Sequence, residues 1–202
     1  YAVQLSVDQG DNSLSADKIV IGYDLTDDLY IWAGEDKAPF LREELTSSSR
    51  QLAVERSLIN EVFTVDKAQG VGLTWTSDMV KVAGMVHDGA HSGDGDATLS
   101  DISVYSGLAP SPDSKDFYED NTDFAITGRI DVLLAGDWKQ AKDFTSWSGE
   151  EMAVFIGGGL HYQTGETGSI SADDSIVVWT VDGSVEVDGL NLYVAYVGAS
   201  TD

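Results

Sequence analysis

Basic residues are scarce in this chain, and almost half of them gather in one segment. The chain has 202 residues, with 11 Lys and Arg against 35 Asp and Glu and a formal charge of −24. The basic residues between positions 37 and 67 are Lys37, Arg42, Arg50, Arg56 and Lys67, and the glutamates among them are Glu43, Glu44, Glu55 and Glu61. Facing charges of opposite sign can line a narrow passage and set a transverse field across it. The spacing equally allows local ion pairs, such as Arg50 with Glu55.

Two further charges, Arg129 and Asp131, lie within an alternating run at residues 124–135. The even positions of this run are apolar, and successive side chains of a strand point to opposite faces. Arg129 and Asp131 therefore share the polar face of the predicted strand. A basic residue that faces lipid at mid-bilayer costs about 2–4 kcal/mol. If this strand crosses a membrane, we expect both residues to face a polar lumen.

Other chemistry finds little support in the sequence. The absence of Cys excludes thiolate metal sites and cysteine nucleophiles, and neither a G-x-S-x-G nor a Walker motif occurs. Asp94, Asp96 and Asp101 could hold Ca²⁺, but the EF-hand loop pattern is absent, which favours a solvated loop. We predict no catalytic residue, no metal and no cofactor. The acidic balance also argues against nucleic acid as a partner.

Alternation of period two predicts an all-β chain. Several predicted strands have ten or more residues, whereas ordinary strands average about 5–6 and tilted membrane strands need about 9–11. Short and long connections mostly alternate, as in outer-membrane barrels, although the connection 137–150 is longer than that pattern predicts. The nine predicted strands lie near residues 1–7, 16–24, 28–34, 68–77, 79–87, 124–136, 151–163, 176–187 and 190–198.

The connection 35–67 is the one stretch with helical character. Ser47–Ser49 supplies N-cap candidates, and Val54, Leu58 and Val62 have helical spacing. These features predict a short amphipathic helix around residues 50–62. Such a helix could pack outside a sheet or fold inward and narrow a barrel lumen.

The same connection carries a family resemblance. Gly34–Phe40 (GEDKAPF) resembles the strand-end motif GQFKxPF of the phosphate-selective porin O/P family, and the similarity continues through Leu41–Ser48, Val54–Leu58 and Gln69–Leu73. The resemblance runs from about residue 16 to the C-terminus and is most specific at 34–73. It implies an antiparallel transmembrane β-barrel of the bacterial outer membrane, often a homotrimer, that passes small hydrophilic solutes or ions by diffusion. It also implies that residues 40–66 form an inward-folded, partly helical constriction loop.

The resemblance turns the charged residues into candidate sites. With it, we favour a pore constriction over local pairing, and we expect Arg129 and Asp131 to line the lumen. The excess of acids argues against phosphate selectivity and for a general or cation-tolerant pore. The residues expected at the constriction are Lys37, Arg42, Glu43, Glu44, Arg50, Glu55 and Arg56.

Two expectations concern the protein as a whole. Nine strands is an odd number, and bacterial single-chain barrels have an even count. We therefore expect residues 1–202 to be one β-barrel domain, incomplete at both ends, in contact with outer-membrane lipid. The alternative is a soluble secreted β-sandwich with acidic, calcium-binding loops. A sandwich hides its apolar face inside, whereas a barrel turns it toward lipid.

Overall fold

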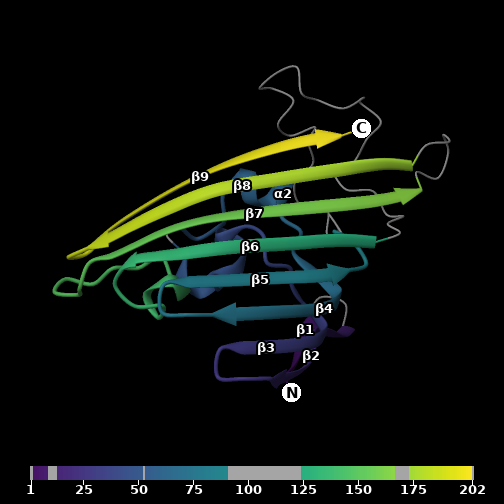
Figure 1. The fold of residues 1–202 in the computed structure, drawn as a ribbon, viewed down its shortest axis with the longest axis horizontal. Coiled ribbons are helices and arrows are strands. Elements are labelled where there is room, and N and C mark those ends of the chain that lie inside the picture. Colours follow the sequence, from purple (N-terminus) through teal and green to yellow (C-terminus); the bar gives the residue numbers. More distant parts are fainter. Residues whose placement is uncertain (1, 9–12, 52, 91–123, 167–172, 202) are drawn as a thin grey trace.

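The computed structural model describes residues 2–8, 13–51, 53–90, 124–166 and 173–201. Their strands form one curved sheet in which each strand pairs with its neighbours in chain order (Figure 1). All pairings are antiparallel. The strands are β1 (Ala2–Asp8), β2 (Ser13–Asp24), β3 (Leu29–Lys37), β4 (Lys67–Thr76), β5 (Val80–His87), β6 (Phe124–Ala135), β7 (Ala153–Glu166), β8 (Asp173–Val187) and β9 (Leu190–Thr201).

The predicted all-β class and antiparallel sheet are confirmed. Each predicted strand has a counterpart whose ends lie within a few residues of the expected ones. Asp188 and Gly189 form the two-residue turn between β8 and β9, and both have positive φ, as tight hairpin turns of this kind require. In the described part of the chain, β1 and β9 do not pair with each other, so the sheet is open.

Apolar side chains are exposed on one face of the sheet, and polar side chains are buried on the other. Along β6, Ile126 and Ile130 are 47% and 53% exposed, whereas Thr127 and Arg129 are 0% and 2% exposed. On β7 and β8 the exposed positions are Ile156, Leu160, Trp179, Val181 and Val185, and the buried ones are His161, Gln163, Thr180, Asp182, Ser184 and Glu186. We call these two surfaces the apolar face and the polar face. Soluble domains have the opposite arrangement.

The polar face is covered by residues 38–66, which we call the crossing segment. It leaves the sheet between β3 and β4, at the end of the sheet where β5 stops and β6 begins. At the other end of the sheet, the Phe144 N–H in the β6–β7 connection donates a hydrogen bond of 3.0 Å to the Arg50 carbonyl. The crossing segment therefore reaches from one end of the polar face to the other.

Short helices shape the crossing segment. They are α1 (Arg42–Leu45), the 3₁₀ turn η1 (Ser48–Arg50) and α2 (Leu58–Phe63), while η3 (Gln140–Lys142) lies between β6 and β7. Of these, α2 overlaps only the last part of the predicted helix around residues 50–62. The predicted cap at Ser47–Ser49 is wrong, because Ser57 caps α2 by accepting the Asn60 N–H. Val54, expected on the helix, precedes α2 and is 94% exposed. No helix in the described ranges is long and apolar enough to cross a membrane.

The crossing segment brings its own apolar core to the polar face. Its Phe40 and Val65 are both 1% exposed, and a fully buried side chain of this size contributes about 1.5–3 kcal/mol. The cluster consists of Val20, Trp32, Ala38, Phe40, Leu41, Val65, Ala68, Met85, Ala90 and Val178. This burial fixes the segment over the sheet and so positions the charged residues described next.

Candidate functional site

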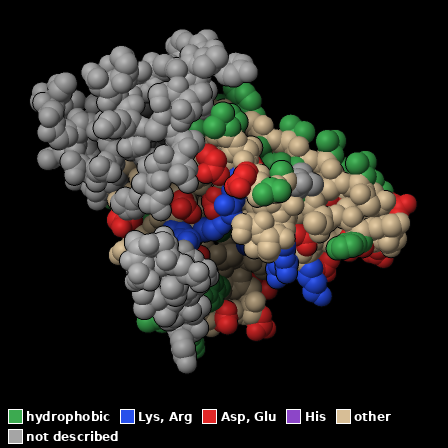
Figure 2. Space-filling view, turned by 180° about the vertical axis from the view of Figure 1, so that it is seen from behind, with side chains coloured by type: hydrophobic (Ala, Val, Ile, Leu, Met, Phe, Trp, Pro, Cys, Tyr) green, Lys and Arg blue, Asp and Glu red, His purple; other side chains and the backbone are tan. Residues whose placement is uncertain are grey.

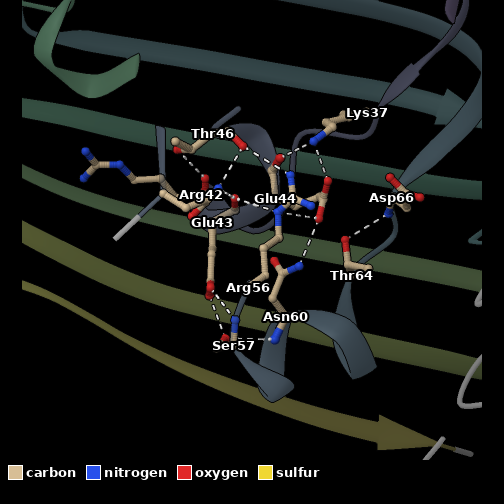
Figure 3. A network of polar contacts seen from close by, with 11 residues as sticks. Lys37, Arg42, Glu43, Glu44, Thr46, Arg56, Ser57, Asn60, Thr64 and Asp66 are labelled. Carbon is tan, nitrogen blue, oxygen red and sulfur yellow. Dashed lines mark hydrogen bonds and ion pairs between the residues drawn. The ribbon is translucent and has the colours of Figure 1, made fainter. Parts of the chain in front are cut away.

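The charged residues of the crossing segment centre on Glu44 of α1 (Figure 3). Its carboxylate lies 2.5 Å from Lys37 Nζ and 3.2 Å from Arg56 Nε, and it accepts a hydrogen bond of 2.9 Å from Asn60 Nδ2. The Lys37 ammonium also donates to the Glu44 carbonyl, at 2.6 Å. These contacts join β3, α1 and α2 into one unit.

Glu43, beside it, has a local structural partner. Its two carboxylate oxygens accept hydrogen bonds from the Ser57 N–H and hydroxyl, both at 2.6 Å. Because Ser57 is the cap of α2, Glu43 ties α1 to the start of α2. Nearby, partial desolvation and then the charge of Glu44 raise the pKa of Glu61 and of Asp66 above their ordinary values.

The Arg42 carbonyl accepts a hydrogen bond from the Thr46 hydroxyl of this network, but its guanidinium lies apart, among aromatic rings. Its guanidinium lies 4.8 Å from the Phe155 ring centre and 5.2 Å from that of Phe144, and it donates a hydrogen bond to the Ser184 hydroxyl of β8. Burial lowers the pKa of Arg42, and Asp182 acts in the opposite direction. A cation stacked on aromatic rings in this way holds α1 against β7 and β8.

Arg129 of β6 is a charged side chain of the polar face that hydrogen-bonds to three different residues. Its guanidinium donates to both oxygens of Asp182, at 2.7 and 2.8 Å, and to Asp131, at 2.6–3.1 Å. It also donates to the Phe40 carbonyl, at 2.9 Å. Arg129 thus links β6 and β8 with the beginning of the crossing segment.

A second polar network lies on the polar face beyond Arg129. His87 Nε2 and His161 Nδ1 lie 2.7 and 2.8 Å from the Thr127 hydroxyl, and His161 Nε2 lies 3.2 Å from Gln163 Oε1. The Ala90 N–H donates to the same Gln163 oxygen, at 2.8 Å. This network gives hydrogen-bond partners to buried polar side chains of β5, β6 and β7.

Two cavities flank the crossing segment. One, of about 730 Å³, lies toward β2–β6 and is lined by charged residues of both signs: Lys18, Lys37, Arg56, Lys67, Lys81 and Arg129, with Asp36, Glu44, Asp66 and Asp131. In a chain of charge −24, this wall holds six basic and four acidic residues. The other cavity, of about 490 Å³, lies toward β9. Its lining includes the apolar residues Leu41, Ile59, Phe144 and Val197 and the charged residues Glu43, Glu55 and Arg56. Figure 2 shows acidic and basic side chains gathered side by side near the middle of this face.

Comparison with known families decides what kind of protein this is. The model of the phosphate-selective porin O and P family matches residues 2–111, just over half of the chain. The chain belongs to this family. The match covers the motif at 34–73 and so confirms the resemblance found in the sequence. No curated protein and no solved structure matches the chain.

This porin family is one of outer-membrane channels, not an enzyme class. The family match ends before β6, yet β6–β9 continue the same sheet with the same apolar and polar faces. The residues matched and those beyond them are therefore parts of one structure. Asp94, Asp96 and Asp101, for which the sequence favours a solvated loop over a calcium site, lie outside the described residues.

The structure places the predicted site residues in three groups. Lys37, Glu44 and Arg56 come together, with Glu43 beside them, and their ion pairs are the local kind that the spacing also allowed. Arg129 and Asp131 pair with each other on the polar face. Arg50 lies 4.0 Å from Asp143 rather than beside Glu55, which is exposed.

Sequence reasoning missed the residues that complete these groups. Asp182 and Ser184 were recognisable only as the polar side of an alternating strand, and Phe144 as an aromatic residue in an unexpectedly long connection. Lys18 and Lys81 carried no signal beyond being basic in an acidic chain. Their positions on the cavity wall follow from strand pairing, which a single strand cannot reveal.

Proposed function

We propose that the chain forms the wall of a closed outer-membrane β-barrel and that small hydrophilic solutes and ions diffuse passively through its lumen. The observation that carries this proposal is the pairing of an exposed apolar face with a buried, charged face on the same strands. In an outer-membrane barrel the first face meets lipid and the second meets the lumen. The family match agrees with this assignment.

The alternative, a soluble β-sandwich, needs the reverse arrangement. A second layer would have to pack on the apolar side of the sheet and remove it from water. Here the crossing segment packs on the polar side instead, and Ile21, Ile130 and Val181 remain 53–71% exposed. We therefore do not favour the sandwich.

Closure of the sheet is part of the proposal. Unpaired backbone groups along a strand edge cannot be left facing lipid, because nothing in the hydrocarbon region hydrogen-bonds to them. The outer edges of β1 and β9 must therefore be paired in the membrane, and further strands of a larger barrel would do so. The homotrimer that the family resemblance implies belongs to the same proposal.

The 730 Å³ cavity is the part of the polar face best suited to a solute path. It is large enough for a hydrated ion or a small metabolite, and its wall bears ten charged side chains. The crossing segment forms one of its sides and would set the narrowest section. We propose that Lys37, Glu44 and Arg56 contribute to this constriction.

Reconstitution of the detergent-extracted protein into planar lipid bilayers tests the proposal. We expect stepwise increases of conductance in NaCl, and swelling of liposomes in small sugars but not in large polysaccharides. A protein that leaves the membrane fraction in buffer alone, stays monodisperse without detergent and adds no conductance would refute the porin assignment.

A further inference from the structure

The triplet Gly157–Gly159 in β7 leaves a gap on the polar face. Odd-numbered residues of β7 point to this face, so Gly157 and Gly159 leave it without a side chain at two successive positions. Gly158 points to the apolar face. In the sheet, Gly157 pairs with Asp131 on one side and with Asp182 on the other. Glycine allows another group to approach a strand closely.

Arg129 occupies this gap. Strands two apart in a sheet are separated by about 10 Å, and the Arg129 side chain crosses that distance from β6 to reach Asp182 on β8. A Cβ on Gly157 would lie 2.1 Å from Arg129 Nη2, and a Cβ on Gly159 would lie 3.0 Å from both Phe40 Cδ2 and the Phe40 carbonyl oxygen. A side chain at 157 would therefore displace the Arg129 guanidinium, and one at 159 would press directly on Phe40.

Arg129 also reaches Phe40, which lies near the start of the crossing segment. Its Nη1 donates at once to the Asp182 carboxylate and to the Phe40 carbonyl, and the Phe40 ring lies on Gly159. A guanidinium is suited to this, because its rigid fork offers five donors in one plane. Lysine could not make these contacts together.

We propose that Arg129 is a positioning residue that clamps the crossing segment to the pore wall through Phe40, and that it does not itself bind the solute. Its side chain is 1% exposed, and Asp131, Asp182 and Phe40 engage all three of its nitrogens. A passing ion would meet little of it. This inference rests on the proposed pore function only for its effect on conductance.

Three alanine variants test the clamp without changing any charge. Gly157→Ala displaces the Arg129 guanidinium, and Gly159→Ala displaces Phe40. Gly158→Ala is the matched control, because its Cβ would meet only the Thr180 carbonyl oxygen, at 3.3 Å, on the apolar side. Arg129→Lys keeps the charge and removes the fork, and Arg129→Met removes both.

The mobility of a spin label reports whether the crossing segment stays fixed to the sheet. The chain has no Cys, so Ser47→Cys gives a unique attachment site in the crossing segment, on an exposed residue beside the charged cavity. We expect the label spectrum to shift to higher mobility in Gly157→Ala, Gly159→Ala and Arg129→Lys, and to stay unchanged in Gly158→Ala. In bilayers, the same variants should lose the single conductance level, while the reversal potential of the charge-preserving ones stays where it was.

The label spectrum can be recorded in detergent whether or not the protein conducts, so it tests the clamp apart from the pore. An immobile label in Gly157→Ala and Gly159→Ala would overturn the proposal. So would a reversal potential shifted by Arg129→Met with the label still fixed, because Arg129 would then act as a wall charge. If Arg129→Met does not fold, the two glycine variants decide.

Discussion

The two faces of the sheet use opposite physical principles, and β6 displays both. On the apolar face, Ile130 is 53% exposed and belongs to neither apolar cluster of the described residues. On the polar face, the adjacent Arg129 is 2% exposed and every nitrogen of its guanidinium donates a hydrogen bond. The apolar face needs only an apolar surrounding. The polar face needs exact partners from β8 and from the crossing segment.

This contrast predicts where substitutions are tolerated. An apolar side chain facing lipid can be exchanged for another, but a charge there loses its hydration. A polar side chain under the crossing segment can be replaced only if its partner remains satisfied, because an orphaned buried charge is costly.

The largest effect on stability is expected from a charge on the apolar face. Ile130→Lys, in the middle of β6, should lower the free energy of unfolding in lipid vesicles by about 2–4 kcal/mol. Leu134→Lys is the matched control: Leu134 is equally exposed, at 53%, but lies near the end of the strand, where the cost falls to about 0–1 kcal/mol. Urea titrations would measure both, and equal, small effects would mean that this face does not contact lipid.

The largest effect on conductance is expected from removing most of the crossing segment. Deletion of residues 44–62 removes α2 and the Glu44 network but keeps Phe40, Arg42 and their contacts with the sheet. If the segment narrows the lumen, the single-channel conductance should rise. An unchanged conductance in a deletion protein that still assembles would exclude the constriction.

How far the sequence could predict these features depends on how local they are. Alternation is a property of a single strand, so it identified the strands and, in β6, the apolar side that carries Ile126 and Ile130. The cap of α2 was misplaced because Ser47–Ser49 and Ser57 are equally good caps by type. In the structure the Ser57 hydroxyl accepts the Asn60 N–H, and Glu43 in turn contacts Ser57.

The partners on the polar face were beyond the reach of pattern analysis. Arg129 was recognised as a charge on the polar side of β6, but its contact with Asp182 depends on the register of three strands. The gap that permits the contact was visible only as three glycines in a strand. Such a pattern indicates that something approaches closely without saying what.

A smaller effect is expected from Glu44, the acid shared by two cations. Glu44→Gln keeps a hydrogen-bonding side chain but leaves Lys37 and Arg56 without their carboxylate. We expect a loss of about 1–3 kcal/mol in unfolding free energy, as for a partly buried group that loses its partner. The reversal potential in a salt gradient should shift toward anion preference. Glu43→Gln is the control. Among the described contacts, the Glu43 side chain accepts hydrogen bonds from Ser57 alone, so this variant should leave the reversal potential unchanged.

The smallest effect is expected in ion selectivity. In the unmodified pore, the charge at the mouth and the charge on the cavity wall favour ions of opposite sign. The overall charge of −24 favours cations at the mouth, whereas the cavity wall carries six basic residues against four acidic ones. The three arginines of the crossing segment already have partners: Arg42 contacts Ser184, Arg50 lies near Asp143, and Arg56 pairs with Glu44. We therefore expect a weak cation preference. Raising the salt should weaken it, because the Debye length falls from about 10 Å at 0.1 M to about 3 Å at 1 M.

The test of this last prediction is the reversal potential across a KCl gradient, in the unmodified protein and in the triple variant Arg42→Ala, Arg50→Ala and Arg56→Ala. Because the charges of Arg50 and Arg56 lie close to acids, and Arg42 is 5% exposed, the triple variant should become only slightly more cation-selective. Assembly of the variant is checked by its heat-dependent migration in gels. A clear anion preference in the unmodified protein that disappears in the triple variant would show that these arginines govern the lumen despite their partners, and that the excess of acids elsewhere has little influence on the ions that pass.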